Sequence, residues 1–413
     1  MTDETKDAPD WVICAGLSCV DLLLLQVDRP PRHDDDLVQF SGVRFAPGGG
    51  VYHTLESVAS TLRASGGKLG SSAVQLRAIT LVGADRFGRF YSRCVSESVA
   101  PEAAQTILFA DTVNTGVSVV PVYRSGARGC YVDLGANRAL ATEAVLRSIS
   151  ALPIIQRSGA GAGSPGSVVL HLAYPHLLPE LQGDHLVDLV SRLQCLFAEA
   201  AESLVLSLDV NGATKRDSTQ LGSAFGIPEF VFQRLDILHA NYEEACTLLD
   251  EEALTESPTW HEPTLQDRAS YSDKLSIRAH GRRLLERFKE RILKSSHSSI
   301  CDERLLVIAV TLGRHGAWVF GGPRKTLMQI GCTEGQFVPP PTIQENQKVN
   351  PTGAGDSFTA GLCLGYLRAM RERSHPRNWH ERSPDEWTRF FAELALQSVS
   401  RKITAELNLH VDL

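Results

Sequence analysis

A glycine-rich tetrad in front of an apolar segment is the strongest chemical signal in the chain. Gly353, Ala354, Gly355 and Asp356 precede the apolar residues 359–367. If a helix begins here, backbone N–H groups left bare by the glycines point at an anion and add to the positive end of the helix dipole. A carboxylate beside a bound phosphate is a poor ligand but a good proton acceptor. The tetrad is therefore typical of phosphoryl transfer to a hydroxyl, with Asp356 as the general base.

The alternative for Asp356 is that it only caps an ordinary helix. Short glycine motifs recur by chance, so the elements around the tetrad must decide between the two interpretations.

Short apolar segments alternate with longer amphipathic ones along most of the chain. Strands are predicted at residues 11–15, 78–82, 168–172, 204–209, 237–240, 305–311 and 317–320. Helices are predicted at about residues 52–63, 178–200, 278–294 and 356–371. This alternation predicts a three-layer α/β/α fold with a mostly parallel sheet, in which ligands bind beyond the carboxyl ends of the strands.

Two segments depart from this pattern. Residues 37–45 and 117–132 alternate apolar and polar side chains, with a turn signal at Ser125-Gly126, and predict antiparallel strands of a small half-exposed sheet. We expect a lid built from about residues 22–46 and 112–134, although an edge decoration would show the same spacing.

Composition excludes several classes of protein. The 413 residues carry a net charge of −7, which offers no attraction for nucleic acid or an anionic membrane, and no apolar segment reaches the length of a membrane span. The nine cysteines are scattered without paired spacing, so we expect reduced thiols and a cytoplasmic protein, with an organelle as the alternative. Residues 1–10 read as a disordered tail rather than a signal peptide, and residues 158–167, 255–272 and 375–385 as insertions in a single domain that spans residues 11–413.

Together these motifs resemble the PfkB/ribokinase family of sugar and nucleoside kinases, from about residue 12 to about residue 407. The matching motifs are Gly48-Gly49-Gly50, the Gly-x-Asp-x-x-Gly turn within residues 82–88, Gly135-Ala136-Asn137, Asn241-x-x-Glu244, the turn Thr311-x-Gly313-x-x-Gly316, and the tetrad ending in Asp356. The resemblance implies a ribokinase-like fold and ATP-dependent transfer of a phosphoryl group to an alcohol.

The resemblance also implies the nucleotide site. Asn241 would contact phosphate oxygens, Glu244 would organise Mg²⁺ through water, and Thr311, Gly313 and Gly316 would form the nucleotide-binding turn. The alternatives without ligand contact are a capping box for Asn241 and Glu244 and a strand-ending turn for Thr311, Gly313 and Gly316.

On the acceptor side, the family match points to five residues. Asp21 would hold substrate hydroxyls, Gly49 and Gly50 would let the backbone approach the substrate, and His53 and Asn137 would contact it from a helix and from the lid. Alternatively, Asp21 is a loop residue and Asn137 only holds a left-handed turn.

Departures from the family pattern limit what it implies. Asn350-Pro351 replaces the usual Asp-Thr, which argues against activation by a monovalent cation such as potassium. His53 stands where an asparagine commonly reads sugar hydroxyls, and residues 173–176 lack the carboxylate of some sugar-specific relatives. A sugar or polyol kinase is favoured over a nucleoside kinase, for which Tyr123 and Tyr131 could stack a base, and over a non-catalytic ligand-binding relative. The lid edges also suggest a homodimer.

Overall fold

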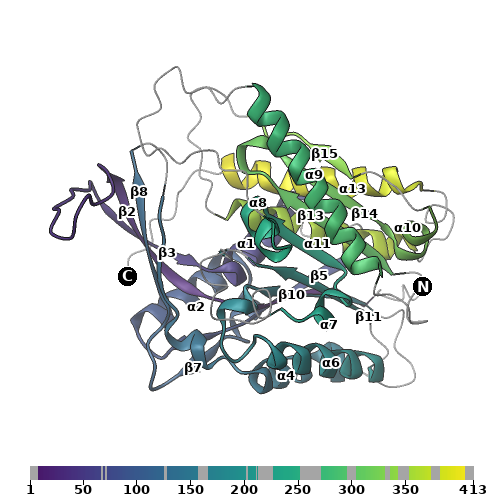
Figure 1. The fold of residues 1–413 in the computed structure, drawn as a ribbon. Helices are drawn as coiled ribbons and strands as arrows, with labels where there is room; N and C mark the ends of the chain where they lie inside the picture. Colours follow the sequence, from purple (N-terminus) through teal and green to yellow (C-terminus); the bar gives the residue numbers. More distant parts are fainter. Residues whose placement is uncertain are drawn as a thin grey trace.

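A nine-stranded sheet runs through the centre of the molecule (Figure 1). This structure is a computed structural model, and it describes residues 8–66, 68–69, 72–124, 128–156, 166–200, 203–210, 212, 227–251, 271–294, 304–330, 335–342, 353–373 and 382–404. In spatial order the strands are β15 (Gln336–Val338), β14 (Ala317–Pro323), β13 (Leu305–Thr311), β12 (Ile237–Asn241), β11 (Ser203–Asp209), β10 (Ser167–Ala173), β1 (Asp10–Gly16), β5 (Ser72–Ile79) and β4 (Lys68–Leu69).

The strands from β13 to β5 are parallel, and β14, β15 and β4 pair antiparallel at the two edges. The central strands are almost wholly apolar and buried, as expected when helices cover both faces of a parallel sheet. The fold class predicted from the sequence is therefore confirmed.

Helices cover the sheet in two layers, each with its own apolar core. One layer contains α1 (Gly50–Ala64), α2 (Arg86–Ser98), α3 (Pro101–Ala104), α11 (Ala354–Arg373) and α13 (Pro384–Thr404). The opposite layer contains α4 (Thr142–Ser150), α5 (Pro153–Gln156), α6 (Asp184–Glu199), α7 (Glu229–Phe232), α8 (Tyr242–Leu248), α9 (Tyr271–Lys294) and α10 (Arg324–Ile330). Short 3-10 turns occupy Gly135–Ala139, Pro175–Leu177 and Gly313–His315.

A separate four-stranded sheet, which we call the lid sheet, projects from one end of the molecule (Figure 1). Its order is β3 (Val43–Gly48), β2 (Cys19–Val27), β8 (Val117–Tyr123) and β9 (Tyr131–Asp133). The expectation of purely antiparallel pairing is wrong, because β2 and β8 run parallel. The expected strand at residues 37–45 is also misplaced, since β3 begins only at Val43 and it is β3 that pairs with β2.

Two other predicted elements begin or end at other residues in the structure than the sequence predicts. The strand expected at residues 78–82 is split between β5 and β6 (Leu81–Gly83), and β6 pairs with β7 (Leu108–Ala110) in a different sheet. Thr80 divides them, and its hydroxyl donates to the carbonyl of Gly16 at 2.8 Å. The helix expected at residues 178–200 starts at Asp184, after Gly183 at φ 58°. Helix α13 was not predicted from the sequence.

The structure bears on the remaining sequence expectations only in part. Strand β1 begins at Asp10, the last residue of the expected tail, while residues 1–7 and most of the three expected insertions lie outside the described residues. The described cysteines are all free thiols. Within the described part of the chain, no helix is long and apolar enough to cross a membrane.

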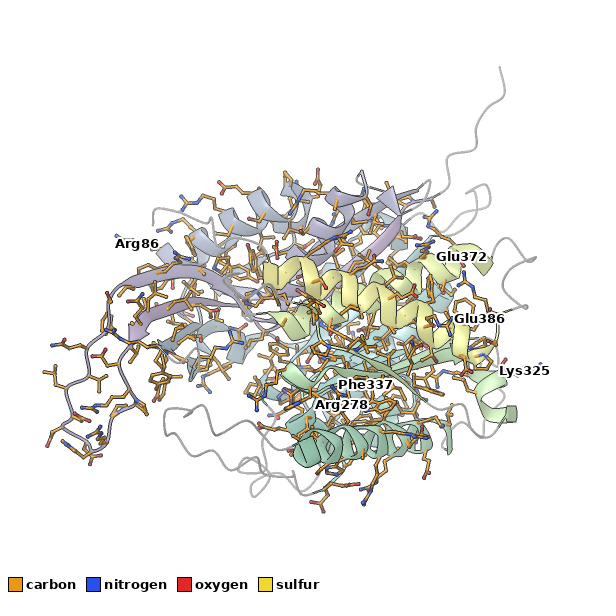
Figure 2. All side chains as sticks on the ribbon, turned by 90° about the horizontal axis from the view of Figure 1, so that it is seen from above. Arg86, Arg278, Lys325, Phe337, Glu372 and Glu386 are labelled. Atoms are coloured by element: carbon orange, nitrogen blue, oxygen red, sulfur yellow. The ribbon has the colours of Figure 1, made fainter. Side chains whose placement is uncertain are left out.

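The sheet edge beside α9 is held by contacts between aromatic rings and α9. The guanidinium of Arg278 lies 4.4 Å from the ring centroid of Phe337 on β15, and both are labelled in Figure 2. The indole N–H of Trp318 on β14 donates to the carbonyl of Arg278 at 2.8 Å. These contacts fix β15, and the residues after β15 form one wall of the site described next.

Candidate active site

One cavity of about 630 Å³ lies beyond the carboxyl ends of β11, β12 and β13. This is the edge at which α/β sheets usually bind ligands. The cavity brings together residues from distant parts of the chain, and those predicted from the sequence are Asn241, Glu244, Thr311, Gly313, Gly316, Gly353, Ala354, Gly355 and Asp356. The nucleotide-side and anion-hole predictions thus converge on one cavity.

Asp356 is the third residue of α11 and is buried at the cavity wall. Gly353 precedes the helix at φ 73°, a conformation that favours glycine, and the N–H of Ser357 bonds back to its carbonyl at 2.9 Å. Burial, together with the nearby charge of Asp209, raises the pKa of Asp356 to about 7. A carboxyl group that titrates near neutral pH is suited to accept a proton.

The carboxylate of Asp356 accepts a hydrogen bond of 2.5 Å from the phenol of Tyr174. Tyr174 follows β10 in a left-handed conformation at φ 58°, and its N–H donates to the carbonyl of Asp209 at 3.1 Å. A strained backbone of this kind is typical of functional sites. The interpretation of Asp356 as an ordinary cap does not explain this long-range contact.

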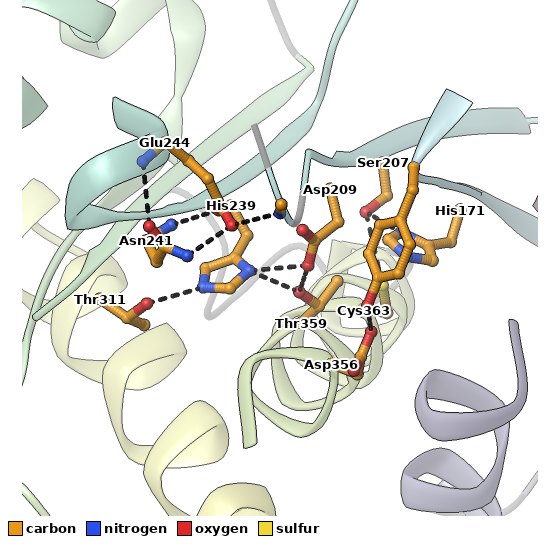
Figure 3. A network of polar contacts seen from close by, with 12 residues as sticks. His171, Ser207, Asp209, His239, Asn241, Glu244, Thr311, Asp356, Thr359 and Cys363 are labelled. Atoms are coloured by element: carbon orange, nitrogen blue, oxygen red, sulfur yellow. Dashed lines mark hydrogen bonds and ion pairs between the residues drawn. The ribbon is translucent and has the colours of Figure 1, made fainter. Parts of the chain in front are cut away.

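A chain of polar contacts crosses the floor of the cavity (Figure 3). Nδ1 of His239 lies 2.9 Å from Oδ2 of Asp209, and its Nε2 lies 3.2 Å from Oγ1 of Thr311. The hydroxyl of Thr359 on α11 lies 3.1 Å from Oδ2 of Asp209 and 3.0 Å from Nδ1 of His239. Three parallel strands and one helix therefore meet at a single buried network.

Asn241 and Glu244 form the capping box that the sequence also allowed as their purely structural role. The N–H of Glu244 donates to Oδ1 of Asn241 at 3.0 Å, and the N–H of Asn241 donates to Oε2 of Glu244 at 2.7 Å. The N–H of Gly212 donates to Oε1 of Glu244 at 2.9 Å. Burial, with the charge of Asp209, raises the pKa of Glu244 to about 7. Both residues also line the cavity, so capping and ligand contact are compatible.

Buried negative charge in the cavity suits a cation. Asp209 raises the pKa of both Glu244 and Asp356, and a divalent ion would relieve this repulsion. Among the described residues, no group of three or more His, Cys, Asp or Glu side chains converges as a metal site. Glu244 fits a magnesium ion as a single carboxylate, with the remaining ligands coming from water and phosphate.

An apolar wall completes the cavity on the side of α13 and β15. Its residues are Ala317, Val338, Pro339, Pro340, Pro341, Phe358, Leu396, Val399 and Ile403. A flat apolar ring fits such a wall, while the turn at Gly313 and Gly316 exposes backbone at its edge. Because α13 was not predicted, the sequence did not indicate this wall.

The predicted acceptor-side residues lie outside the lining of this cavity, on β2, α1 and the turn after β9. Asp21 on β2 is buried, and burial raises its pKa to about 6, although hydrogen bonds from Cys19 and Ser118 and the charge of Arg128 act in the opposite direction. Asp21 is therefore not the surface loop residue of the alternative reading.

Gly49 and Gly50 allow close approach of chain segments. Gly49 has φ 82°, and a Cβ there would lie 2.6 Å from the carbonyl oxygen of Leu17. A Cβ at Gly50 would lie 2.8 Å from Cζ of Tyr174, so Gly50 makes room for the ring that reaches Asp356.

His53 and Asn137 occupy contrasting environments. His53 packs against Gly353, where a Cβ would lie 3.0 Å from Cγ of His53, and its buried Nδ1 has no hydrogen-bond partner among the residues that the structure describes. Burial, with the charges of Lys402 and Arg128, lowers the pKa of His53 to about 3, so this imidazole is neutral. Asn137 instead binds the backbone of Ser18, with Oδ1 accepting at 3.0 Å and Nδ2 donating at 2.7 Å.

Asn350, on which the monovalent-cation expectation rests, lies outside the described residues.

Several site residues were missed from the sequence. These are Asp209, His239, Thr359, Tyr174 and the lid residue Arg128, which lines the cavity. Asp209 ends a predicted strand and could have been found by the rule that ligands bind beyond strand ends. His239 lies inside an apolar strand, where its spacing offers no signal.

One protein family and several solved structures are similar to this chain. Residues 285–406 match the model of the pfkB family carbohydrate kinases. A comparison of the sequence with curated proteins finds no match.

Solved structures with the same fold cover nearly the whole chain. Ribokinase from Giardia lamblia has a TM-score of 0.61 at 16% identity, covering 96% of this chain and 93% of that protein. Arabidopsis thaliana ribokinase, solved with ribose and ATP, has a TM-score of 0.56 at 15% identity and covers 97% and 94%. Burkholderia thailandensis nucleoside kinase, solved with inosine, has a TM-score of 0.52 at 12% identity and covers 96% and 92%. The pfkB family model therefore matches the part of the chain from within α9 to α13, and the likeness to the solved structures shows a ribokinase-like fold over nearly the whole chain.

Proposed function

We propose that this protein transfers the γ-phosphate of ATP to a hydroxyl of a sugar or related polyol. One observation carries the proposal: the buried Asp356, whose pKa is raised to about 7, shares a cavity with the glycine loop at the start of α11 and with the turn after β13. An anion-binding helix start next to a carboxylate that titrates near neutral pH is the arrangement that phosphoryl transfer to an alcohol requires.

In the proposed reaction the nucleotide occupies the cavity with its base on the apolar wall and its phosphates towards Asn241 and the glycine loop. The N–H groups of Gly353, Ala354 and Gly355 hold the transferring phosphoryl group. Ribokinase structures solved with ADP or ATP support a nucleotide in a fold of this kind. Glu244 would help hold Mg²⁺, which when bound neutralises charge on the phosphates.

Asp356 takes the proton of the acceptor hydroxyl as its oxygen attacks the γ-phosphorus. One P–O bond forms to the acceptor while the P–O bond to ADP breaks, and ADP leaves with the electron pair. A positioned base of this kind contributes roughly a hundredfold to ten-thousandfold in rate. The hydrogen bond from Tyr174 stabilises the charged form of Asp356 until the proton is transferred.

The acceptor is expected beside Asp21, Gly49, Gly50 and His53. The buried carboxylate of Asp21 can accept hydrogen bonds from hydroxyl groups, and Nδ1 of the neutral His53, which has no partner among the described residues, can donate or accept according to the tautomer. A buried carboxylate and a neutral imidazole, both able to bond to hydroxyl groups, favour a polyhydroxylated ligand.

ADP release with Mg-ATP against a panel of sugars, polyols and nucleosides tests the proposal, with Asp356→Asn run alongside. Asp385→Asn is the matched control, because Asp385 lies exposed in the first turn of another helix, α13. We expect turnover with a sugar or polyol that falls by at least a hundredfold in Asp356→Asn and persists in Asp385→Asn. Turnover of wild-type size in Asp356→Asn contradicts the assignment of the base.

The nucleoside alternative is tested by the same panel. Nucleoside kinases share this fold, so turnover confined to nucleosides would reassign the acceptor within the same mechanism. Stoichiometric ATP binding without ADP release on any acceptor would favour a non-catalytic binding protein.

A further inference from the structure

His239 is a buried side chain on β12 that lies directly beneath the glycine loop. In the sheet it stands between Asp209 of β11 and Ala309 of β13. A Cβ at Gly355 would lie 3.4 Å from Cε1 of His239, and the ring stacks on Phe358 at 5.6 Å between centroids. Its position is therefore set from below by the sheet and from above by the start of α11.

Both ring nitrogens of His239 have polar neighbours, and these neighbours set its charge. Nδ1 faces Asp209 and Thr359, and Nε2 faces Thr311, as Figure 3 shows. Burial opposes a charged imidazole, but the carboxylates of Asp209, Glu244 and Asp356, of which Asp209 acts most strongly, together outweigh it, and the pKa of His239 is raised. A positive charge on His171 of β10 would oppose one on His239, but burial lowers the pKa of His171 to about 4, so it adds no charge near neutral pH.

The charge of His239 decides in which direction the hydroxyl of Thr311 points. A doubly protonated ring donates from Nδ1 to Asp209 and from Nε2 to Oγ1 of Thr311. Thr311 then accepts one hydrogen bond, and its own O–H can donate into the cavity that it lines. If His239 lost the Nε2 proton, Nε2 would accept from Thr311, and only lone pairs of Thr311 would face the cavity.

Phosphate oxygens are acceptors, so they require the first arrangement. We propose that His239 is a positioning residue for the donor nucleotide. Asp209 and Thr359 hold the ring of His239, and the ring turns the hydroxyl of Thr311 so that it donates to a phosphate oxygen. This inference rests on the proposed function, because it requires a polyphosphate in the cavity. It adds that affinity for the phosphate chain, but not for adenosine, depends on the protonation of His239, which acts on the phosphate through the hydroxyl of Thr311.

Calorimetry with ATP and with adenosine at pH values from 6 to 9 tests the inference. Thr311→Val removes the hydroxyl with little change in shape, and Thr311→Ser keeps it. A hydrogen bond to a charged acceptor corresponds to roughly a tenfold to hundredfold change in affinity. We expect Thr311→Val to bind ATP more weakly by that factor at pH 6, to bind adenosine normally, and to be rescued by Thr311→Ser.

The decisive readout is the ratio of ATP affinities of wild type and Thr311→Val. Titration of ATP itself is common to both proteins and cancels, so the ratio should fall towards one as the pH rises through the pKa of His239. His239→Asn should weaken ATP binding to the level of Thr311→Val and show no such pH dependence, and the double variant should be no worse than either single variant. His185→Asn, at an exposed histidine of α6, is the matched control and should behave as wild type.

The outcomes separate the two proposals. If wild type binds ATP and the ratio stays constant with pH, the role of His239 is overturned while the kinase proposal stands. If Thr311→Val binds ATP as tightly as wild type, the inference also fails. This test remains valid even if His239→Asn does not fold. If wild type binds no ATP, the proposed function fails and the inference fails with it.

Discussion

The phenol of Tyr174 donates a hydrogen bond of 2.5 Å to Oδ1 of Asp356, although the two residues are 182 positions apart in the chain. Tyr174 reaches this carboxylate from the end of β10, past Gly50, where any side chain would collide with its ring. Three segments that are far apart in the sequence therefore meet at one carboxyl group.

Tyr174→Phe should shift the pH dependence of catalysis. Removing this bond takes away stabilisation of the charged carboxylate, so the pKa of Asp356 should rise. A hydrogen bond to a charged group corresponds to about one to two pH units, so the acidic limb of the kcat/KM profile should move upwards by that amount. Tyr131→Phe, at an exposed lid residue, is the control. An unmoved limb in Tyr174→Phe would contradict this role.

Asp356→Asn should become more stable than wild type as the pH rises. The pKa of Asp356 is raised from 3.8 to about 7, chiefly by burial, so its contribution to stability is fully present below pH 3.8 and is lost as the pH rises through 7. Asparagine cannot ionise and avoids this loss. We expect thermal unfolding at pH 8.5 to show a gain of about 2–4 °C, with none at pH 4. The same pH-dependent gain in Asp385→Asn would rule out burial of Asp356 as the cause.

Asp21→Asn should weaken acceptor binding without affecting ATP. Losing a charged hydrogen-bond acceptor should raise the KM for the sugar or polyol by roughly tenfold to a hundredfold. In wild type the acceptor KM should rise as the pH falls below about 6, where Asp21 becomes protonated. Asp28→Asn, at a half-exposed residue just beyond the same strand, is the control. Equal increases in the KM values for ATP and acceptor would indicate a general disturbance rather than a contact.

Glu244→Gln should raise the Mg²⁺ concentration needed for activity. Glutamine keeps a carbonyl oxygen that can accept from the N–H of Asn241, so the helix cap is retained while the charge is removed. Loss of a supporting carboxylate typically weakens metal binding by about tenfold to a hundredfold. ADP release measured against free Mg²⁺ at saturating ATP checks this, with the exposed neighbour Glu243→Gln as control. Identical magnesium curves for both variants would remove Glu244 from the metal site.

The sequence by itself determined the fold class and indicated part of the lining of the cavity. Apolar strands such as residues 305–311 are buried in any parallel sheet with two covered faces, so composition alone identifies them. The residues predicted for the anion hole and the nucleotide side, Gly353 to Asp356 with Asn241, Glu244 and Thr311, line one cavity, because each follows a strand or begins a helix, while their roles stay predictions. Local signals carry these predictions, since glycine and capping residues act within a few positions of the chain.

Only the tertiary structure decided what surrounds those residues. His239 reads as part of an apolar strand until Asp209 and Thr359, from other elements, are placed around it. Local sequence patterns also gave no sign of three other features: the apolar wall from α13, the parallel pairing of β2 with β8, and the hydrogen bond from Tyr174 to Asp356. Charge state and hydrogen-bond direction depend on burial and on neighbours that folding brings together. The pKa values of Asp356, His239 and Glu244 are therefore properties of the packed sheet and helices rather than of the motifs that contain these residues.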